Sequence, residues 1–206
     1  MDAQAASLAR AYEAGGAACL SVLTDADRFG GSPQDLREAR SAVSIPVLRK
    51  DFLSTAQDVH ESHEMGADAL LVILADVDIK RVKPLQDLAL TLGMDVLTEV
   101  RTEQELEAAV DHGAYMIAVN QRNDPKDPRF TVDYGKAVAM SRMFDQLDAG
   151  IVMVAASGIG VPGGTPLAAV EDAGYDAALI GEALVTAPDP TAALLHIRNR
   201  EPVPVG

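Results

Sequence analysis

The stretch EMGADALLVI, residues 64–73, carries the end of a predicted helix into a predicted strand through one glycine. Gly66 stands where a helix commonly ends, because glycine accepts the left-handed backbone conformation that closes the last turn. The apolar run after it is too short for a core helix and suits a strand that is buried on both faces. The stretch therefore predicts one repeat of a parallel sheet that is covered by helices.

The same order of helix, glycine and strand occurs three more times. It is found in EAGGAACLSV, DHGAYMIAV and EDAGYDAALI, at residues 13–22, 111–119 and 171–180. A repeated unit of this kind is typical of folds that are built from successive βα units. Counting every apolar run, we expect seven strands, at residues 19–24, 46–52, 69–75, 95–100, 116–121, 151–157 and 177–181.

Regular alternation of these strands with amphipathic helices predicts an α/β protein of the TIM-type (β/α) barrel class. The chain opens with a predicted helix at residues 7–16, so the first strand of an eight-stranded barrel has no counterpart and seven parallel strands are recognisable. A doubly wound open sheet is the alternative. An open arc of seven strands leaves two edges with unpaired backbone groups, and we expect a homo-oligomer or a rearranged segment to cover them.

Length and composition bound the class of protein. The chain has 206 residues, 48% of them hydrophobic, which suffices for one buried core, so we expect a single (β/α) barrel-like domain over residues 1–206. The segment NDPKDPRFTVD, residues 123–133, has the prolines and charges of a surface loop. The formal net charge of −14 argues against nucleic acid and anionic membranes as partners, although a few positive groups in a cleft can still bind an anionic small molecule.

The sequence also predicts where the protein works. Its N-terminus lacks the basic and apolar segments of a secretion signal, and its longest apolar run, ALLVILA, is far shorter than a membrane span. The single cysteine, Cys19, lies in the apolar run CLSVLT, where we expect a buried thiol that behaves as a small hydrophobic group. These features predict a cytoplasmic protein.

Functional groups of a parallel barrel gather at the carboxyl ends of its strands. Those ends are polar for five of the expected strands. They carry Lys50, Asp51 and Phe52; Glu99; Asn120 and Arg122; Ser157 and Gly158; and Gly181 and Glu182. One such residue alone would be an ordinary solvated loop residue, but five strand ends together predict an active site.

Two pairs of these residues suit particular chemistry. Lys50 and Glu99 can act as proton donor and acceptor when they reach one site, and the alternative is a structural ion pair. Asn120 and Arg122 are two residues apart on a strand and so face the same side, where an amide and a guanidinium suit a ligand with a carboxylate. For this second pair the alternative is the anchoring of a loop.

The glycine-rich turns SGIGVPGG and GEAL follow the last two expected strands. Bare backbone amides and a helix N-terminus at this place favour a phosphate site, and a pair of ordinary tight turns is the alternative. His60 and His63 are three residues apart in an acidic helix with no evident third ligand, so we expect no metal site.

The motifs along the chain resemble those of one enzyme family. SVLTDADRFGGSPQDLR, PVLRKDF, GMDVLTEV, VNQRND, ASGI and LIGEAL, in this order, are similar to the strand-end motifs of indole-3-glycerol phosphate synthases over about residues 2–197. The resemblance implies a carbon–carbon lyase (a carboxy-lyase) of tryptophan biosynthesis. Its substrate would be 1-(2-carboxyphenylamino)-1-deoxyribulose 5-phosphate, which closes to an indole with loss of carbon dioxide and water, without a metal or other cofactor.

The resemblance also implies a role for each residue. Lys50 would be the general acid, Glu99 would assist proton transfer during dehydration, and Asn120 would orient that network. Arg122 would lie near the aromatic carboxylate. Phe29 and Phe52 would line the anthranilate pocket, Ser157 would contact the substrate, and the phosphate end would be bordered by Gly158, Gly181 and Glu182.

The sequence departs from the family pattern at two places. The family's first strand carries a Glu-x-Lys pair that has no counterpart in the 206 residues, and Ala156 stands where the family usually has glutamate before its SGI motif. Loss of groups that cooperate in one site costs orders of magnitude in rate, so these departures predict low activity for this chain. The alternatives are a catalytically impaired relative that acts as a binding or assembly subunit, and an enzyme with altered chemistry on a related anthranilate or sugar phosphate.

Overall fold

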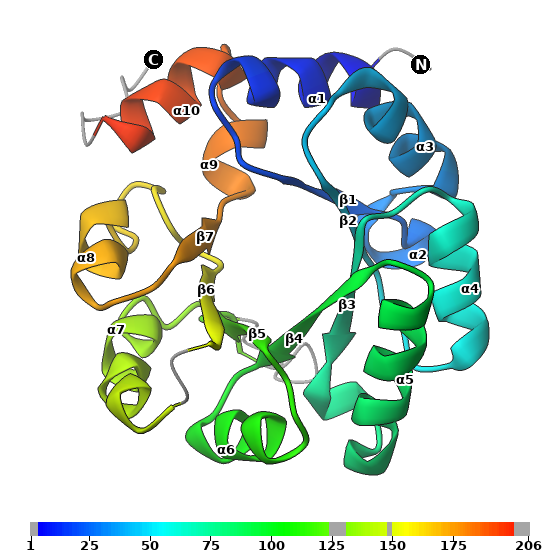
Figure 1. Cartoon of the computed structure of the whole chain (residues 1–206). Helices are drawn as coiled ribbons and strands as arrows, with labels where there is room; N and C mark the ends of the chain where they lie inside the picture. Colours follow the sequence, from blue (N-terminus) through cyan, green and yellow to red (C-terminus); the bar gives the residue numbers. More distant parts are fainter. Residues whose placement is uncertain (1–3, 124–130, 148–149, 200–206) are drawn as a thin grey trace. The chain divides into compact units, whose positions relative to one another are not determined.

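The computed structural model describes residues 4–123, 131–147 and 150–199 (Figure 1). Parallel strands alternate with helices, and the seven predicted strands are confirmed among the described residues. The strands are β1 Leu20–Leu23, β2 Val47–Lys50, β3 Ala69–Ile73, β4 Asp95–Val100, β5 Met116–Asn120, β6 Val152–Ala156 and β7 Ala177–Leu179. Their order in the sheet is the order of the sequence. This order favours the predicted barrel class, because a doubly wound sheet reverses its strand order.

The chain divides into two compact units, Met1–Leu97 and Thr98–Gly206, and β4 crosses the boundary. The prediction of a single domain over residues 1–206 stays a prediction. The helices of the first unit are α1 Gln4–Ala14, α2 Ala26–Phe29, α3 Pro33–Ala42, α4 Ala56–Glu64, the 3-10 turn η1 Leu74–Asp76, and α5 Ile79–Thr91. Those of the second are α6 Glu103–Asp111, α7 Lys136–Met140, the 3-10 turn η2 Ser141–Gln146, α8 Leu167–Asp172, α9 Glu182–Val185 and α10 Pro190–Arg198.

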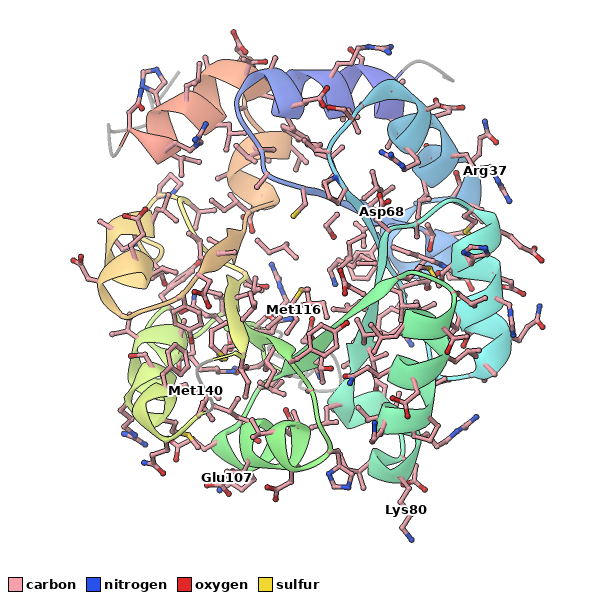
Figure 2. The ribbon with its side chains drawn as sticks, viewed as in Figure 1. Arg37, Asp68, Lys80, Glu107, Met116 and Met140 are labelled. Atoms are coloured by element: carbon pink, nitrogen blue, oxygen red, sulfur yellow. The ribbon has the colours of Figure 1, made fainter. Side chains whose placement is uncertain are left out.

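In the first unit, α3, α4 and α5 lie on the same side of β1, β2 and β3 (Figure 1). Each helix buries a narrow stripe that is mostly apolar in α5 and consists of Leu36 and Ala39 in α3. Arg37 of the same helix and Lys80 of α5 are exposed and point away from the strands (Figure 2). This division is what an amphipathic helix on a sheet requires, since only one of its faces leaves water.

In the second unit, α6, α7 and α8 lie along the outside of the strands that they connect (Figure 1). β5 pairs with β4 on one side and with β6 on the other, and β6 pairs with β7. All of these pairs are parallel, and the central residues of β5 and β6 are fully or almost fully buried. Apolar side chains on both strand faces are expected where helices cover one face and a core fills the other.

The glycines of the helix–glycine–strand repeat behave as predicted. Gly16, Gly66, Gly113 and Gly174 follow α1, α4, α6 and α8, and all have positive φ. Two residues after two of these glycines, an aspartate ties one strand to the next. Asp68 Oδ2 accepts from the Val47 N–H at 2.8 Å, and Asp176 Oδ2 accepts from the Met153 N–H at 2.8 Å. The repeat therefore fixes both the end of a helix and the register of the strand after it.

The expectation of a buried Cys19 thiol is wrong. β1 begins at Leu20, and Cys19 is exposed in the segment before it. An apolar run shows that a strand is near but does not fix its first residue. The predicted surface loop at residues 123–133 lies mostly outside the described residues, and its ends meet where the Asn123 N–H donates to Thr131 O at 2.9 Å. None of the described helices has the length and apolarity needed to cross a membrane.

Candidate active site

Strand register in the second unit places three strand-end positions on one face. Glu99 pairs with Ala118, and Asn120, two residues further along β5, pairs with Ala156. Paired residues of parallel strands point to the same face, and so do residues two apart on one strand. Glu99, Asn120 and Ala156 therefore share a face, and the side chains of Glu99 and Asn120 are only 4% and 9% exposed.

Glu99 lies in a buried ion pair. Its Oε1 accepts from Arg101 Nη2 at 3.0 Å, and the Arg101 side chain is 10% exposed. A buried carboxylate without a partner would be strongly unfavourable, and the guanidinium of Arg101 offsets the burial of the Glu99 carboxylate. Arg101 was absent from the residues predicted for the site, because it follows the strand and has the appearance of an ordinary loop residue.

Asn120 and Arg122 are joined by a hydrogen bond, and their predicted role toward a carboxylate stays a prediction. Asn120 Oδ1 accepts from the Arg122 backbone N–H at 2.9 Å, which fixes the amide side chain. The Arg122 guanidinium is 3.7 Å from Glu182 Oε2, at the start of α9. This contact joins Arg122, which was predicted to bind a carboxylate, to Glu182, which was predicted to border the phosphate end. Both side chains of this pair are partly exposed, so its contribution to stability is small.

Gln121 occupies the opposite face, where the helices lie, and sequence reasoning missed it. Its Nε2 donates to Ser157 O at 2.7 Å, and its Oε1 accepts from the Ala137 N–H at 3.3 Å. The Thr165 hydroxyl lies within hydrogen-bond distance of both amide atoms. Gln121 is fully buried and joins the ends of β5 and β6 to α7. The two-residue alternation that placed Asn120 on one face could have placed Gln121 on the other.

We expect Gln121→Met to lower the free energy of unfolding by about 3 kcal/mol, because it leaves several buried polar groups without partners in a cavity of nearly unchanged volume. Urea unfolding followed by circular dichroism measures the change. Gln57→Met is the matched control, since Gln57 is exposed on α4 and bonds only Glu61 among the described residues. Equal effects of the two substitutions would contradict the role given to Gln121.

The turn after β6 carries the predicted residues Ser157 and Gly158, both with positive φ. Ser157 has φ 70°, a strained conformation for a residue with a side chain, and the Gln121 amide holds its carbonyl group. A Cβ at Gly158 would lie 2.6 Å from the Tyr134 ring, and the Gly158 carbonyl accepts from the Thr165 N–H at 2.9 Å. Gln121, Tyr134 and Thr165 therefore hold the turn in one conformation, as a backbone anion site requires.

Gly181, also predicted for the phosphate end, is the N-cap of α9 and is exposed. Its carbonyl oxygen accepts from the N–H groups of Leu184 and Val185 at 2.9 and 3.0 Å. The predicted helix start after β7 is thus confirmed, and α9 runs only from Glu182 to Val185. The role of Gly181 toward a phosphate stays a prediction.

Lys136 is a charged group near Glu99 that sequence reasoning also missed. Its Nζ lies 3.4 Å from Asn120 O and 3.4 Å from Asn123 Oδ1. Partial burial lowers the pKa of Lys136 below its ordinary value, and the neighbouring Arg101 lowers it further, while Asp133, Glu105 and Glu99 act in the opposite direction. The lysine lies at the start of α7, and nothing in its local sequence marks it.

The lowered pKa of Lys136 predicts a pH dependence of stability. A lysine whose pKa is lower in the folded state costs stability below that folded pKa, and the cost disappears as pH rises toward the unfolded value of about 10.4. We therefore expect the stability of wild type relative to Lys136→Met to rise between neutral pH and pH 10. Urea unfolding at both pH values measures it, with Lys83→Met, an exposed lysine on α5, as control. A wild-type disadvantage that is independent of pH would contradict this prediction.

In the first unit, Lys50 ends β2 on the face opposite α4. Its neighbour Arg49 points the other way and donates to Asp58 O and Ser62 Oγ of α4, at 3.2 and 3.1 Å. Because successive strand residues alternate, the half-buried Lys50 side chain is directed away from that helix. Within residues 4–97, no side chain forms a hydrogen bond with the Lys50 ammonium group.

Asp51, beside Lys50, belongs to the buried network of Arg49. Its Oδ2 accepts from Thr24 Oγ1 at 2.6 Å and from Arg49 Nη2 at 3.0 Å. Burial by itself would raise the pKa of Asp51, but hydrogen bonds from Thr24, from the Phe52 N–H and from Arg49, with the charge of Arg49, hold that pKa below its ordinary value. Asp51 is thus an ionised structural group that ties the ends of β1 and β2 together.

Phe29 and Phe52, predicted to line one pocket, lie together in the first unit. Their rings are nearly parallel, with centroids 6.3 Å apart, and Phe29 is 48% exposed. Arg28 lies over the Phe52 ring, with its guanidinium carbon 4.0 Å from the ring centroid. Stacked aromatic rings that are partly exposed are suitable for contact with an aromatic ligand.

The structure therefore distributes the predicted residues over two groups. Lys50, Phe29 and Phe52 lie in the first unit, at the end of β2 and in the helix α2 that follows β1. The second unit holds the others, which are Glu99, Asn120, Arg122, Ser157, Gly158, Gly181 and Glu182. Their catalytic and binding roles stay predictions. Among the described residues, no group of three or more His, Cys, Asp or Glu side chains is arranged to hold a metal ion.

Solved structures similar to this chain share its fold. One is described as a native KDPGal structure, with a TM-score of 0.67, 18% identity, and coverage of 97% of this chain and 90% of the other. Another is KGPDC from Streptococcus mutans, with a TM-score of 0.69, 13% identity, and coverage of 95% and 89%. Since these are TIM-barrel-type proteins, the predicted (β/α) barrel class is confirmed.

Sequence comparison adds the family. The chain is 44% identical over 192 residues to the indole-3-glycerol phosphate synthase of Mycobacteroides abscessus, covering 93% of this chain and 68% of that protein. It is also 44% identical over 197 residues to the enzyme of the same name from Streptomyces griseus, covering 95% and 70%. The family model described as indole-3-glycerol phosphate synthase matches residues 1–197. From its strand-end residues, its fold and these matches, the chain belongs to the indole-3-glycerol phosphate synthase family.

Proposed function

We propose that this chain is a carboxy-lyase of tryptophan biosynthesis that closes the indole ring of 1-(2-carboxyphenylamino)-1-deoxyribulose 5-phosphate. Family membership supports the reaction class. One observation carries the proposal. Lys50 and Asn120 are the last residues of β2 and β5, and Glu99 is the last but one of β4. All three lie on strand faces turned away from α4, which bonds Arg49, and from α7, which bonds Gln121. In a (β/α) barrel this is where catalytic side chains belong.

The reaction needs an acid first. The ring carbon that bears the carboxylate attacks the ketone carbon, the ketone oxygen gains negative charge, and a proton must reach it. The Lys50 ammonium is a suitable donor, because it stabilises the developing oxyanion before the proton moves. Carbon dioxide then leaves, and the electrons of the broken carbon–carbon bond return to the aromatic ring. The intermediate still carries the hydroxyl group formed from the ketone, which is lost in the dehydration.

Dehydration needs a base and an acid. The hydroxyl formed from the ketone leaves as water once it is protonated, and a proton is lost from the ring system. Glu99 is proposed to move this proton, and Asn120, fixed by the Arg122 N–H, is proposed to orient the leaving hydroxyl. Arg122 is proposed to bind the aromatic carboxylate before it leaves, and Phe29 and Phe52 to contact the aromatic ring.

A phosphorylated substrate needs an anion site. We propose that Ser157, Gly158 and Gly181 form its sugar-phosphate end through the backbone of the turn after β6 and the start of α9, with Glu182 at the border. Although the formal net charge of the chain is −14, this site would be locally favourable for an anion, because a few positive groups and backbone dipoles are concentrated there. No cofactor is required by this chemistry.

The test is turnover by the purified wild-type chain. Product fluorescence is followed after addition of the carboxyphenylamino-deoxyribulose phosphate, and formation of indole-3-glycerol phosphate is checked by mass spectrometry. Product formation supports the lyase. A folded chain that forms no product at micromolar concentration over hours would refute it.

One observation favours a second candidate, a non-catalytic relative that binds or assembles. Ala156 pairs with Asn120 in register and so lies on the face of Glu99, at the place where the family usually has a glutamate. Binding of indole-3-glycerol phosphate without turnover of the substrate would support this candidate. An altered reaction on a related anthranilate or sugar phosphate would instead show consumption of that compound.

Location and assembly complete the proposal. We infer a cytoplasmic enzyme, in keeping with a biosynthetic reaction on a phosphorylated metabolite and with a single cysteine. Association of copies through the outer strands β1 and β7 stays a prediction.

A further inference from the structure

The geometry points to Arg101 as a positioning residue for Glu99, an inference that rests on the function proposed above. Arg101 Nη2 donates to Glu99 Oε1 at 3.0 Å, and the two side chains are nine-tenths or more buried. Glu99 lies in β4 and Arg101 is the first residue after it, two positions along the chain, and the contact between them places both side chains on one face. The guanidinium therefore meets the carboxylate without a flexible loop between them.

The backbone of Arg101 is fixed by the first turn of α6. The Arg101 N–H donates to Glu105 Oε2 at 2.5 Å, and the Glu105 N–H donates in return to Oγ1 of Thr102, the N-cap residue, at 3.2 Å. This exchange of hydrogen bonds resembles a capping box shifted by one residue, and it holds residue 101 in one conformation. A guanidinium on a fixed backbone can hold its partner in one rotamer.

The donors of Arg101 argue for function rather than stability. The one hydrogen bond that its side chain makes among the described residues goes to Glu99, and its Nε is buried without an acceptor there. Buried donors are normally satisfied, and an unsatisfied one lowers stability. An arginine kept for stability would also have an acceptor for its Nε–H group. The cost of burying this donor is therefore explained by the positioning of Glu99.

Lys136 does not replace Arg101 in this role. The charge of the Lys136 ammonium group interacts with that of Glu99, but the hydrogen bonds of this group go to Asn120 O and Asn123 Oδ1, both at 3.4 Å. A lysine is also a point charge on a flexible stem, whereas the guanidinium is a rigid fork. Direct contact and geometry both favour Arg101.

A positioning role predicts a particular kinetic signature. Arg101→Met should lower kcat by about tenfold or more and change KM by less than about twofold, because Arg101 acts on the proton-transferring group and not on the ligand. Arg142→Met is the matched control, since Arg142 pairs with Glu103 of α6 in the same unit but is exposed. Arg101→Lys keeps the charge without the fork, so its kcat should lie between wild type and Arg101→Met.

A double-mutant cycle tests whether Arg101 acts through Glu99. In a Glu99→Gln background, Arg101→Met should change kcat by less than about twofold, because the group that it positions is already lost. Thermal unfolding of each variant identifies any that does not fold, and Arg101→Lys then carries the test. Three outcomes would each overturn the inference about Arg101 and leave the proposed function standing. The first is a kcat of Arg101→Met and Arg101→Lys equal to that of Arg142→Met. The others are a raised KM with unchanged kcat, and additive effects of Arg101→Met and Glu99→Gln. An inactive wild-type chain would overturn the proposed function together with it.

Discussion

Replacing Lys50 with alanine is expected to lower kcat for ring closure by about 100- to 10,000-fold, the range that a general acid contributes. The ammonium group would be lost at the point where negative charge develops on the ketone oxygen, and water is a poor substitute for a positioned donor. The fold should survive, because Lys50 is half-buried at the end of β2 and the buried network of Arg49 and Asp51 beside it stays intact. Steady-state kinetics from product fluorescence measures the loss.

Lys83→Ala is the control for this substitution. Lys83 lies in the same unit, is exposed on α5, and forms an ion pair with Asp87 four residues along the helix at 2.8 Å. The Lys83→Ala substitution removes the same charge and the same side chain away from any strand end, so kcat should be unchanged. If Lys50→Ala kept kcat within about threefold of this control, Lys50 would have no role as the acid.

Gly31→Ala is expected to have a large effect on stability, a loss of about 3 kcal/mol in the free energy of unfolding. A Cβ at Gly31 would lie 2.2 Å from the carbonyl oxygen of Leu23 and 2.6 Å from its carbonyl carbon. Those atoms belong to the end of β1 and cannot move like the end of a flexible side chain. The loop that carries Phe29 would have to leave the strand, so turnover should fall as well.

Gly30→Ala separates this clash from backbone strain. Gly30 has φ 67°, but no atom lies within 4 Å of the place of its Cβ. Its substitution should therefore cost only about 1–2 kcal/mol, the price of a left-handed conformation. Chemical unfolding of both variants compares the two directly. A loss at Gly30 equal to or greater than that at Gly31 would contradict the close packing of this loop on β1.

Much of the fold follows from local rules that are readable in the sequence. Gly66 and Gly113 mark helix ends because only a residue without a side chain takes their backbone conformation readily, and the apolar runs after them became strands. Cys19 shows the limit of such rules. The run that contains it did predict β1, but an apolar run has no feature that fixes the first paired residue, and pairing begins at Leu20.

The faces of the strands could be predicted only in part. Alternation shows that Lys50 and Arg49 point to opposite sides, as do Asn120 and Gln121. A strand in a covered parallel sheet is apolar on both faces, so its pattern does not tell which face meets the helices. Only the contacts of Arg49 with α4, and of Gln121 with α7, decided that Lys50 and Asn120 are directed the other way.

By itself, the sequence determined the element order, the seven strands, the strand-end residues and, through its motifs, the family. These depend on neighbouring residues, whose backbone preferences and spacing are fixed by covalent connection. Tertiary structure alone decided that Arg101 meets Glu99, that Lys136 is partly buried beside Asn120, and that Asp51 supports Arg49. Such partners are set by how strands and helices pack and by which polar groups lose water together, and neither is encoded in any one stretch of the chain.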